Sequence, residues 1–164
     1  MRTIINIRKY SSEDASEIWD ILKPIIREGD SFIFFPESTQ EAILDYWCSN
    51  LKNTYTALIE NQIVGTFFIQ DNQPGLGSHV ANAGYATSQK YSGKGIGKQM
   101  GLFSLTEAKK LGYKAMQFNI VVKTNKRAVF LWQDIGFNII GEIPDAFHHR
   151  TLGFVNAYIM YKNL

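Results

Sequence analysis

A glycine-rich segment, residues 91–101, directly precedes a stretch with helical periodicity. Its three alternating glycines are Gly93, Gly95 and Gly97. Glycine adopts positive φ angles readily and lets the backbone approach a ligand closely. A helix that begins near Gly97 would point its free N–H groups at an anion, and Lys94 and Lys98 add positive charge. The segment therefore predicts a phosphate-binding loop.

The glycine spacing excludes two common phosphate loops. A P-loop requires four residues between its glycines and Ser or Thr after the lysine, but Gly93 and Gly97 enclose three residues and Gln99 follows Lys98. A Rossmann motif would need glycine at position 98 or 100, where Lys98 and Met100 stand. What remains is a Gly-x-Gly-x-Gly segment that opens a helix late in the chain.

Length and composition indicate a single domain over residues 1–164, with 45% hydrophobic residues to form a core. The net charge of +2 is too small to indicate nucleic-acid binding. We see neither a signal-peptide pattern nor an apolar run that could span a bilayer, so we expect a cytoplasmic protein without a membrane partner. The one cysteine, Cys48, excludes an intrachain disulfide and is expected to be a buried, inert thiol.

Periodicity predicts the elements that must position this loop. Strands are expected at residues 4–8, 54–59, 63–69, 80–87, 115–122, 137–143 and 154–161. Helices are expected to begin near residues 11–14, 38, 97 and 125. Pro24 should kink or end the first helix, and Ser38 with Glu41 should cap the second. This order predicts a mixed α/β domain with a largely antiparallel sheet.

The glycine segment resembles the central motif of the GNAT superfamily of acetyl-CoA-dependent N-acetyltransferases, which is Arg or Gln, two residues, then Gly-x-Gly or Ala. Here Ser92 stands in place of the Arg or Gln. Residues 125–137 resemble the superfamily's Asn-x-x-Ala-x-x-Leu-Tyr-x-x-x-Gly-Phe helix and turn. Residues 28–36 and 118–119 resemble a subgroup that includes fungal acetyltransferases acting on proline analogues. The resemblance implies a GNAT fold, with about seven strands flanked by about four helices.

The resemblance also implies a binding site for acetyl-CoA, in which backbone N–H groups bind the pyrophosphate and the strand before the loop pairs with the pantetheine arm. The implied cofactor-binding residues are Tyr85, Ala86, Thr87, Ser92, Gly93, Lys94, Gly95, Ile96, Gly97, Lys98, Asn125, Ala128 and Trp132. Asn125 could serve only as an N-cap, and Trp132 only as a core residue. No metal is expected.

Acetyl transfer requires a neutral amine. Deprotonating an amine with a pKa near 10 costs about 4 kcal/mol at pH 7. Many members of the superfamily place a Glu on the fourth strand as a base, but here Asn82 occupies that strand, which contains no acid. Asn82 could position substrate or water, or make a strand-edge hydrogen bond. Asn119 is the stronger candidate, as an acceptor-binding or oxyanion-stabilising group or as a satisfied core amide. Trp132 stands where the superfamily commonly uses a proton-donating Tyr.

The acceptor would be bound by two further segments. Residues 29–36 either fold over the core or form a wall of an acceptor pocket through Phe32, Phe34 and Phe35. Residues 142–150, between the last two strands, are expected to form a charged surface loop or the rim of the acceptor site. His148 or Glu142 in that loop could act as a base through water.

The chain is therefore expected to transfer acetyl from acetyl-CoA to the amine of a small amino-acid-like molecule by direct attack. Two alternatives stay open: acetylation of a protein or peptide by the same fold, and a CoA-binding sensor with weak catalysis. The expected partner is a small-molecule amine, without nucleic acid, and a homodimer is compatible with the resemblance.

Overall fold

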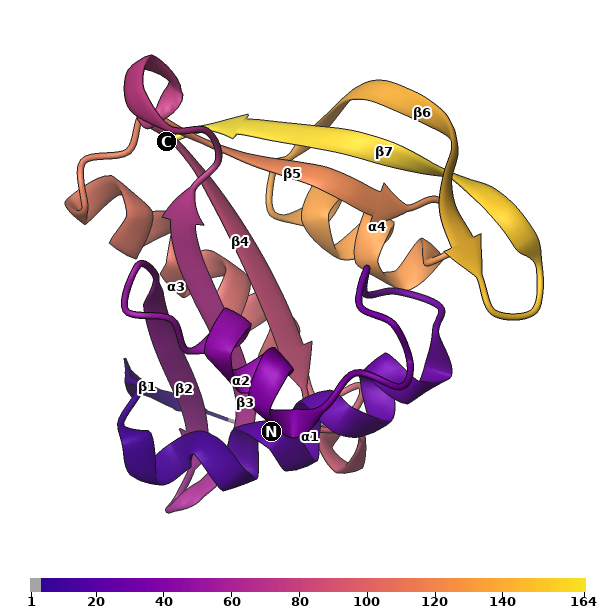
Figure 1. Cartoon of the computed structure of the whole chain (residues 1–164). Coiled ribbons are helices and arrows are strands. Elements are labelled where there is room, and N and C mark those ends of the chain that lie inside the picture. The colour runs from indigo at the N-terminus through magenta and orange to yellow at the C-terminus, as the bar shows by residue number, and fades with distance from the viewer. Residues whose placement is uncertain (1–3) are drawn as a thin grey trace.

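The computed structural model describes residues 4–164, which form four α-helices and one seven-stranded sheet (Figure 1). The helices are α1 (Ala15–Glu28), α2 (Gln40–Trp47), α3 (Ile96–Lys110) and α4 (Lys126–Asp134). The strands are β1 (Asn6–Lys9), β2 (Asn53–Ile59), β3 (Gln62–Asp71), β4 (Val80–Thr87), β5 (Ala115–Val122), β6 (Asn138–His149) and β7 (Gly153–Asn163). The sheet order is β1-β2-β3-β4-β5-β7-β6, and only β4 and β5 pair in parallel. This confirms the predicted mixed α/β architecture.

The parallel pair β4–β5 is very short. Its register comprises Val80 with Ala115 and Ala81 with Met116, while β4 remains paired with β3 as far as Thr87. Beyond Ala81 the two strands diverge, so that β5, β7 and β6 swing away from the first four strands (Figure 1). One backbone edge of the rest of β4 is therefore turned toward the space between the strands.

Helices cover both faces of the sheet. On one face α1 and α2 pack through Ile18, Leu22 and Trp47, all fully buried. On the other face α3 and α4 pack through Met100 and Trp132 against the central strands. No helix among residues 4–164 combines the length and apolar character needed to cross a bilayer. The sheet thus has a hydrophobic core on each face. The gap between the diverging strands β4 and β5, which we call the splay, lies between the two helical layers.

Helix α1 does not end at Pro24, one of the two outcomes expected there, but continues to Gly29, which has a left-handed conformation with φ 64°. Proline in a helix interior costs about 3 kcal/mol. Leu22 and Ile26, on either side of it, are 0% and 1% exposed. Burial of such side chains contributes about 1.5–3 kcal/mol each, which offsets that cost.

Two further boundaries differ from the sequence predictions. The N-cap of α2 is Thr39 rather than Ser38, since the Thr39 Oγ1 accepts a hydrogen bond from the N–H of Ala42 at 3.2 Å. The predicted loop at residues 142–150 is mostly strand, because β6 pairs with β7 as far as His149 opposite Gly153. Two register shifts interrupt that pairing, so that the hairpin is longer and more irregular than the sequence suggested.

The Arg8–Asp14 ion pair ties β1 to the start of α1. The Asp14 carboxylate accepts hydrogen bonds from Arg8 Nη1 and Nη2 at 2.7 and 2.8 Å and from the Ser11 N–H at 2.8 Å, and Asp14 is only 6% exposed. The hydrogen bonds from Arg8 lower the pKa of Asp14 below its usual range. Asp14 therefore stabilises the fold above its unfolded pKa near 3.9, and this contribution is lost as pH falls through its lower folded pKa.

We expect Asp14→Asn to lower the free energy of unfolding at pH 7 by about 2 kcal/mol, because a charged hydrogen-bonding group is lost from a buried site. Denaturant unfolding at pH 7 and at pH 2 checks this. As pH falls from 7 to 2 the stability of the wild type should approach that of the variant, since the contribution of the Asp14 charge is lost as the folded chain takes up its proton. Glu13→Gln, a change at an exposed neighbour, is the control. An equal deficit at both pH values would contradict the role of the Asp14 charge.

Candidate active site

A cleft of about 910 Å³ lies between the diverging strands β4 and β5. Its walls come from β4, the glycine segment, β5, α4 and the segment that joins α1 to α2. Among the residues that line it are the sequence-predicted Asn82, Tyr85, Ala86, Thr87, Ser92, Gly93, Gly95, Ile96, Gly97, Lys98, Asn119, Asn125, Ala128 and Trp132. The structure thus brings almost all predicted cofactor residues and both predicted catalytic amides into one cleft.

The glycine segment forms the N-terminal end of α3. Gly93 and Gly95 have φ angles of 79° and 76°, and a Cβ at either position would meet no atom within 4 Å. Gly95 is the N-cap, and the N–H of Gln99 makes the first intrahelical bond to its carbonyl at 3.1 Å. The N–H groups before Gln99 therefore point out of the helix end into the cleft. This arrangement fits an anionic diphosphate.

The two lysines of the glycine loop both contact other side chains of the protein. Lys98 forms an ion pair with Asp134 at 2.6 Å, and the Lys94 ammonium lies over the ring of Tyr91, 4.7 Å from its centroid. The predicted cofactor residue Lys94 does not line the cleft, in contrast to Lys98. The positive charge of both lysines is thus partly engaged within the protein.

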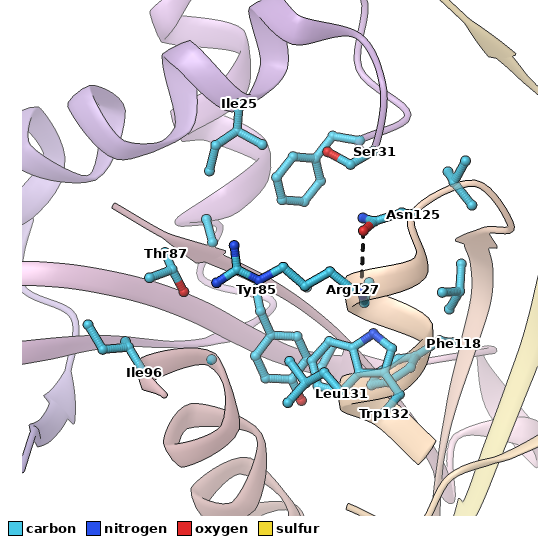
Figure 2. A pocket seen from close by; sticks show the side chains of 18 of the residues that line it. Ile25, Ser31, Tyr85, Thr87, Ile96, Phe118, Asn125, Arg127, Leu131 and Trp132 are labelled. Carbon is cyan, nitrogen blue, oxygen red and sulfur yellow. Dashed lines mark hydrogen bonds between the residues drawn. The ribbon is translucent and has the colours of Figure 1, made fainter. Parts of the chain in front are cut away.

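Arg127 is a residue that the sequence interpretation missed. It extends from the first turn of α4 across the cleft (Figure 2). Its Nη1 donates a hydrogen bond to Ser92 Oγ at 2.6 Å. Ser92 is the position where the motif normally has Arg or Gln, so a guanidinium reaches the loop from α4 instead. The signal available in the sequence was the second motif itself, since Arg127 lies within it.

The inner wall of the cleft is aromatic. The rings of Tyr85 and Phe118 lie 4.7 and 4.8 Å from that of Trp132, which is 8% exposed (Figure 2). The Tyr85 hydroxyl hydrogen-bonds with Ser104 Oγ at 2.6 Å, and burial raises the pKa of Tyr85 above its usual value. Trp132 packs in the core and also lines the cleft, and its contact with the cofactor stays a prediction.

Asn125 likewise has both of its predicted roles available. Its Oδ1 accepts a hydrogen bond from the Ala128 N–H at 3.2 Å, which caps α4, and it lines the cleft beside Arg127 (Figure 2). A cap bond uses one lone pair of the oxygen, so the side-chain NH₂ group stays available to a ligand.

Asn119 does not lie in the core, where its apolar strand suggested that it might. The pairing of β5 with β7 shifts between Phe118 and Val121, and Asn119 is exposed at this irregularity. Its Nδ2 donates to Asn72 Oδ1 at 2.7 Å, and its Oδ1 accepts from Gln117 Nε2 at 3.0 Å. Asn119 therefore lines the cleft at a break in the ladder.

A cluster of aromatic side chains closes the side of the cleft opposite α4. Its members, which all line the cleft, are Phe32, Phe34, Tyr46, Trp47 and Phe68. They pack edge to face, with centroids 5.7 Å apart for Phe32–Trp47, 4.9 Å for Trp47–Phe68 and 5.1 Å for Phe34–Tyr46. We call this group the aromatic chamber. Two of the predicted acceptor-binding residues, Phe32 and Phe34, belong to it.

Three other residues predicted for the acceptor site lie elsewhere. Phe35 is 75% exposed and does not line the cleft. His148 stacks on Phe154 at 4.6 Å on the β6–β7 hairpin, and Glu142 pairs with Lys123 at 2.6 Å. Strand pairing carries residues 142–149 along the hairpin instead of folding them as a loop over the cleft. Neither His148 nor Glu142 is therefore placed to act as a base in the cleft.

The sequence matches the acetyltransferase (GNAT) family over residues 16–137, and the chain belongs to that family. It is 36% identical over 101 residues to N-acetyltransferase aca1 of Schizosaccharomyces pombe, a match that covers 61% of this chain and 48% of that protein. The chain thus spans about half the length of this curated relative.

Solved structures share the whole fold. A GCN5-related N-acetyltransferase from Kribbella flavida superposes with a TM-score of 0.92 at 32% identity, covering 98% of both chains. The structure of yncA from Salmonella typhimurium with its cofactor acetyl-CoA superposes with a TM-score of 0.85 and covers 98% of this chain and 94% of that chain. Its identity of 15% shows similarity of fold alone.

Arg127→Met should raise the Kd for acetyl-CoA about tenfold, because a charged donor to phosphate is lost while the helix N-terminus is kept. Isothermal titration at low and high salt measures this, and the wild-type advantage should shrink as salt screens the exposed guanidinium. Lys126→Met, a loss of charge at the exposed neighbour, is the control. Equal weakening by both substitutions would show a general charge effect instead of a contact by Arg127.

Proposed function

We propose that this chain is an N-acetyltransferase that moves acetyl from acetyl-CoA to the amine of a small amino-acid-like acceptor by direct attack. One observation carries the proposal: a single cleft has an anion-binding helix N-terminus at one end and the aromatic chamber on one side. The pyrophosphate would bind at Gly93–Gly97 and the pantetheine arm along the free edge of β4, at Tyr85–Thr87.

Direct attack agrees with the side chains present. The amine nitrogen would bond to the thioester carbon, the carbon–sulfur bond would break, and the proton released by nitrogen would pass to water. Cys48 lies outside the cleft, and burial raises the pKa of its thiol, so that it is not a nucleophile for this reaction. Trp132 carries only an indole N–H, which does not ionise at neutral pH. The sulfur would therefore leave as the thiolate.

The aromatic chamber favours a small acceptor over a protein. Phe32 and Phe34 come from the segment after α1, which folds over the cleft and packs on Trp47 and Tyr46. A peptide chain would need an open groove that continues past this segment. An acceptor with a compact apolar body fits the chamber better, and the surrounding edge-to-face contacts hold its shape.

The test is thiol release from acetyl-CoA with free amino acids and proline analogues, compared with peptides that begin with the same residues. We expect kcat/KM to be at least about tenfold higher for the best free amine, since a peptide would have to displace the covering segment. A preference for peptides would establish the protein-acetylating alternative. Tight acetyl-CoA binding without release for any acceptor would establish the sensor alternative.

Asn119→Ala should lower turnover by about tenfold or more and leave acetyl-CoA binding unchanged, because Asn119 offers an amide donor at the cleft and lies away from the glycine loop. Steady-state kinetics with the best free amine measure turnover, and titration measures binding. Asn138→Ala, at an exposed position on β6, is the control. Turnover equal to wild type would assign Asn119 a structural role in holding Asn72.

A further inference from the structure

Gln70 is a cleft residue that the sequence motifs do not include. It lies near the end of β3, directly opposite Asn82 of β4, and it is half-buried in the cleft wall. Its Nε2 donates a hydrogen bond to Asn82 Oδ1 at 3.3 Å. The two amides therefore form a cross-strand pair on the face of the sheet that looks into the cleft.

The orientation of both amides is fixed by a backbone group. Asn82 Nδ2 donates to the carbonyl oxygen of Gln117 at 3.0 Å, and a carbonyl can only accept. Asn82 must therefore turn its oxygen toward Gln70, and Gln70 must turn its NH₂ group toward Asn82. It follows that Gln70 Oε1 points away from Asn82. Gln70 lines the cleft, and its Oε1 is thus a carbonyl acceptor, held in one orientation, that Asn82 does not use.

The amide pair lies where the splay begins. The last parallel pair of β4 and β5 is Ala81 with Met116, and the next residue of each strand is joined by the bond from the Asn82 side chain to the Gln117 carbonyl. The Asn82 side chain thus joins β4 to β5 one residue beyond the last backbone pair, at the point where the two strands begin to diverge. This assigns Asn82 a positioning role.

Gln70 also forms the polar end of the aromatic chamber. Phe68 lies two residues before Gln70 on the same face of β3 and contacts Trp47 at 4.9 Å between centroids. Opposite Phe68 is Gly84, where a Cβ would lie 2.7 Å from the Phe68 ring. The missing side chain at Gly84 leaves room for that ring in the cleft wall. An apolar surface and a fixed carbonyl acceptor therefore lie side by side.

We propose that Gln70 positions the acceptor amine, with Oε1 accepting one of its N–H bonds; this inference rests on the proposed transfer to a small amine. A hydrogen bond at that N–H would set the direction of the nitrogen lone pair, which must face the thioester carbon. The neutral Gln70 amide does not take up the proton that the amine nitrogen releases after attack. That proton passes to water as the sulfur leaves as the thiolate. The acceptor class is a primary or secondary amine on a compact apolar body, with the body against Phe68 and Tyr46.

The test compares two substitutions that both lose the bond to Asn82 and differ in whether an accepting oxygen is kept. Gln70→Met keeps the length of the side chain and removes both hydrogen-bonding groups, whereas Gln70→Glu keeps an accepting oxygen and loses the bond to Asn82. With the fastest free amine of the panel, Gln70→Met should raise the KM of the amine about tenfold and leave the Kd of acetyl-CoA within twofold. Gln70→Glu should retain a lower KM than Gln70→Met. Gln133→Met, at an exposed glutamine outside the cleft, is the control.

Equal KM values for the Met and Glu variants would overturn the inference, because they would show that Gln70 acts only by holding Asn82. A second measurement needs no variant: on adding the same amine to the CoA-bound wild-type protein, the side-chain amide signal of Gln70 in a nitrogen–proton NMR spectrum should shift. An unchanged signal at saturating amine would also overturn the inference. If no amine is turned over while acetyl-CoA still binds, the acceptor class itself fails, an outcome distinct from indifference to Gln70.

Discussion

Gly95→Asp is expected to abolish measurable acetyl-CoA binding, weakening it by at least about 100-fold, because a carboxylate would stand where the pyrophosphate meets the end of α3. Gly95 is the N-cap of α3, with φ 76° and ψ 11°, and no atom lies within 4 Å of its built Cβ. The new Cβ would therefore have space beside the helix end, and the carboxylate would stand at the anion site. Calorimetric titration of acetyl-CoA measures the loss.

Gly112 offers a matched control for backbone strain. It has φ 96°, its built Cβ also meets nothing within 4 Å, and it follows the opposite end of α3. Gly112→Asp therefore introduces the same residue in a comparable left-handed conformation, away from the cleft, and should leave the Kd near the wild-type value. Gly95→Asn, which removes the charge, should bind more tightly than Gly95→Asp. If Gly95→Asp bound acetyl-CoA normally, the assignment of the loop would be wrong.

Trp132→Ala is expected to lower the free energy of unfolding by about 3–5 kcal/mol, the usual cost of truncating a buried large aromatic side chain. The indole is 8% exposed and contacts Tyr85, Phe118 and Phe137, with centroids 4.7, 4.8 and 6.1 Å away. Its removal would leave a void between α4 and the splayed strands. Denaturant unfolding measures the change.

Phe130 on the same helix is 71% exposed, so Phe130→Ala should change stability by no more than about 0.5 kcal/mol. Trp132→Phe keeps an aromatic ring and loses the indole N–H. If the thiolate leaves without a dedicated acid, Trp132→Phe should retain turnover within a few-fold of wild type. A loss of turnover in Trp132→Phe at full stability would show that the indole N–H takes part in the reaction.

Strand periodicity predicted the central sheet well, and the reasons are local. Residues 80–87 and 115–122 have the predicted bounds, since both runs are mostly apolar. The β6–β7 hairpin was harder, because β6 is an edge strand and edge strands tolerate polar residues and proline. Its charged residues and Pro144 therefore read as a loop. Past Pro24, tertiary burial of Ile26 decided the helix, and no local signal predicts it.

Some residues of the candidate site could likewise be predicted from the sequence and others could not. The glycine loop was predictable, because only glycine suits its positive φ angles and its spacing excludes other loops. Gln70 was not predictable, because its place depends on strand register. Arg127 lies within the second motif, but its reach to Ser92 depends on how the elements pack in three dimensions. His148, predicted for the acceptor site, lies on β6 outside the residues that line the cleft, because strand pairing carries it along the hairpin.

The central claim is direct acetyl transfer to a small amine, and one labelling experiment tests it. The protein is incubated with acetyl-CoA that carries a deuterated acetyl group and with the fastest free amine, and amide, free thiol and intact protein mass are followed together. We predict one labelled amide for each thiol released and no labelled acetyl group on the protein. Thiol without amide, or label retained on the protein, would contradict the account.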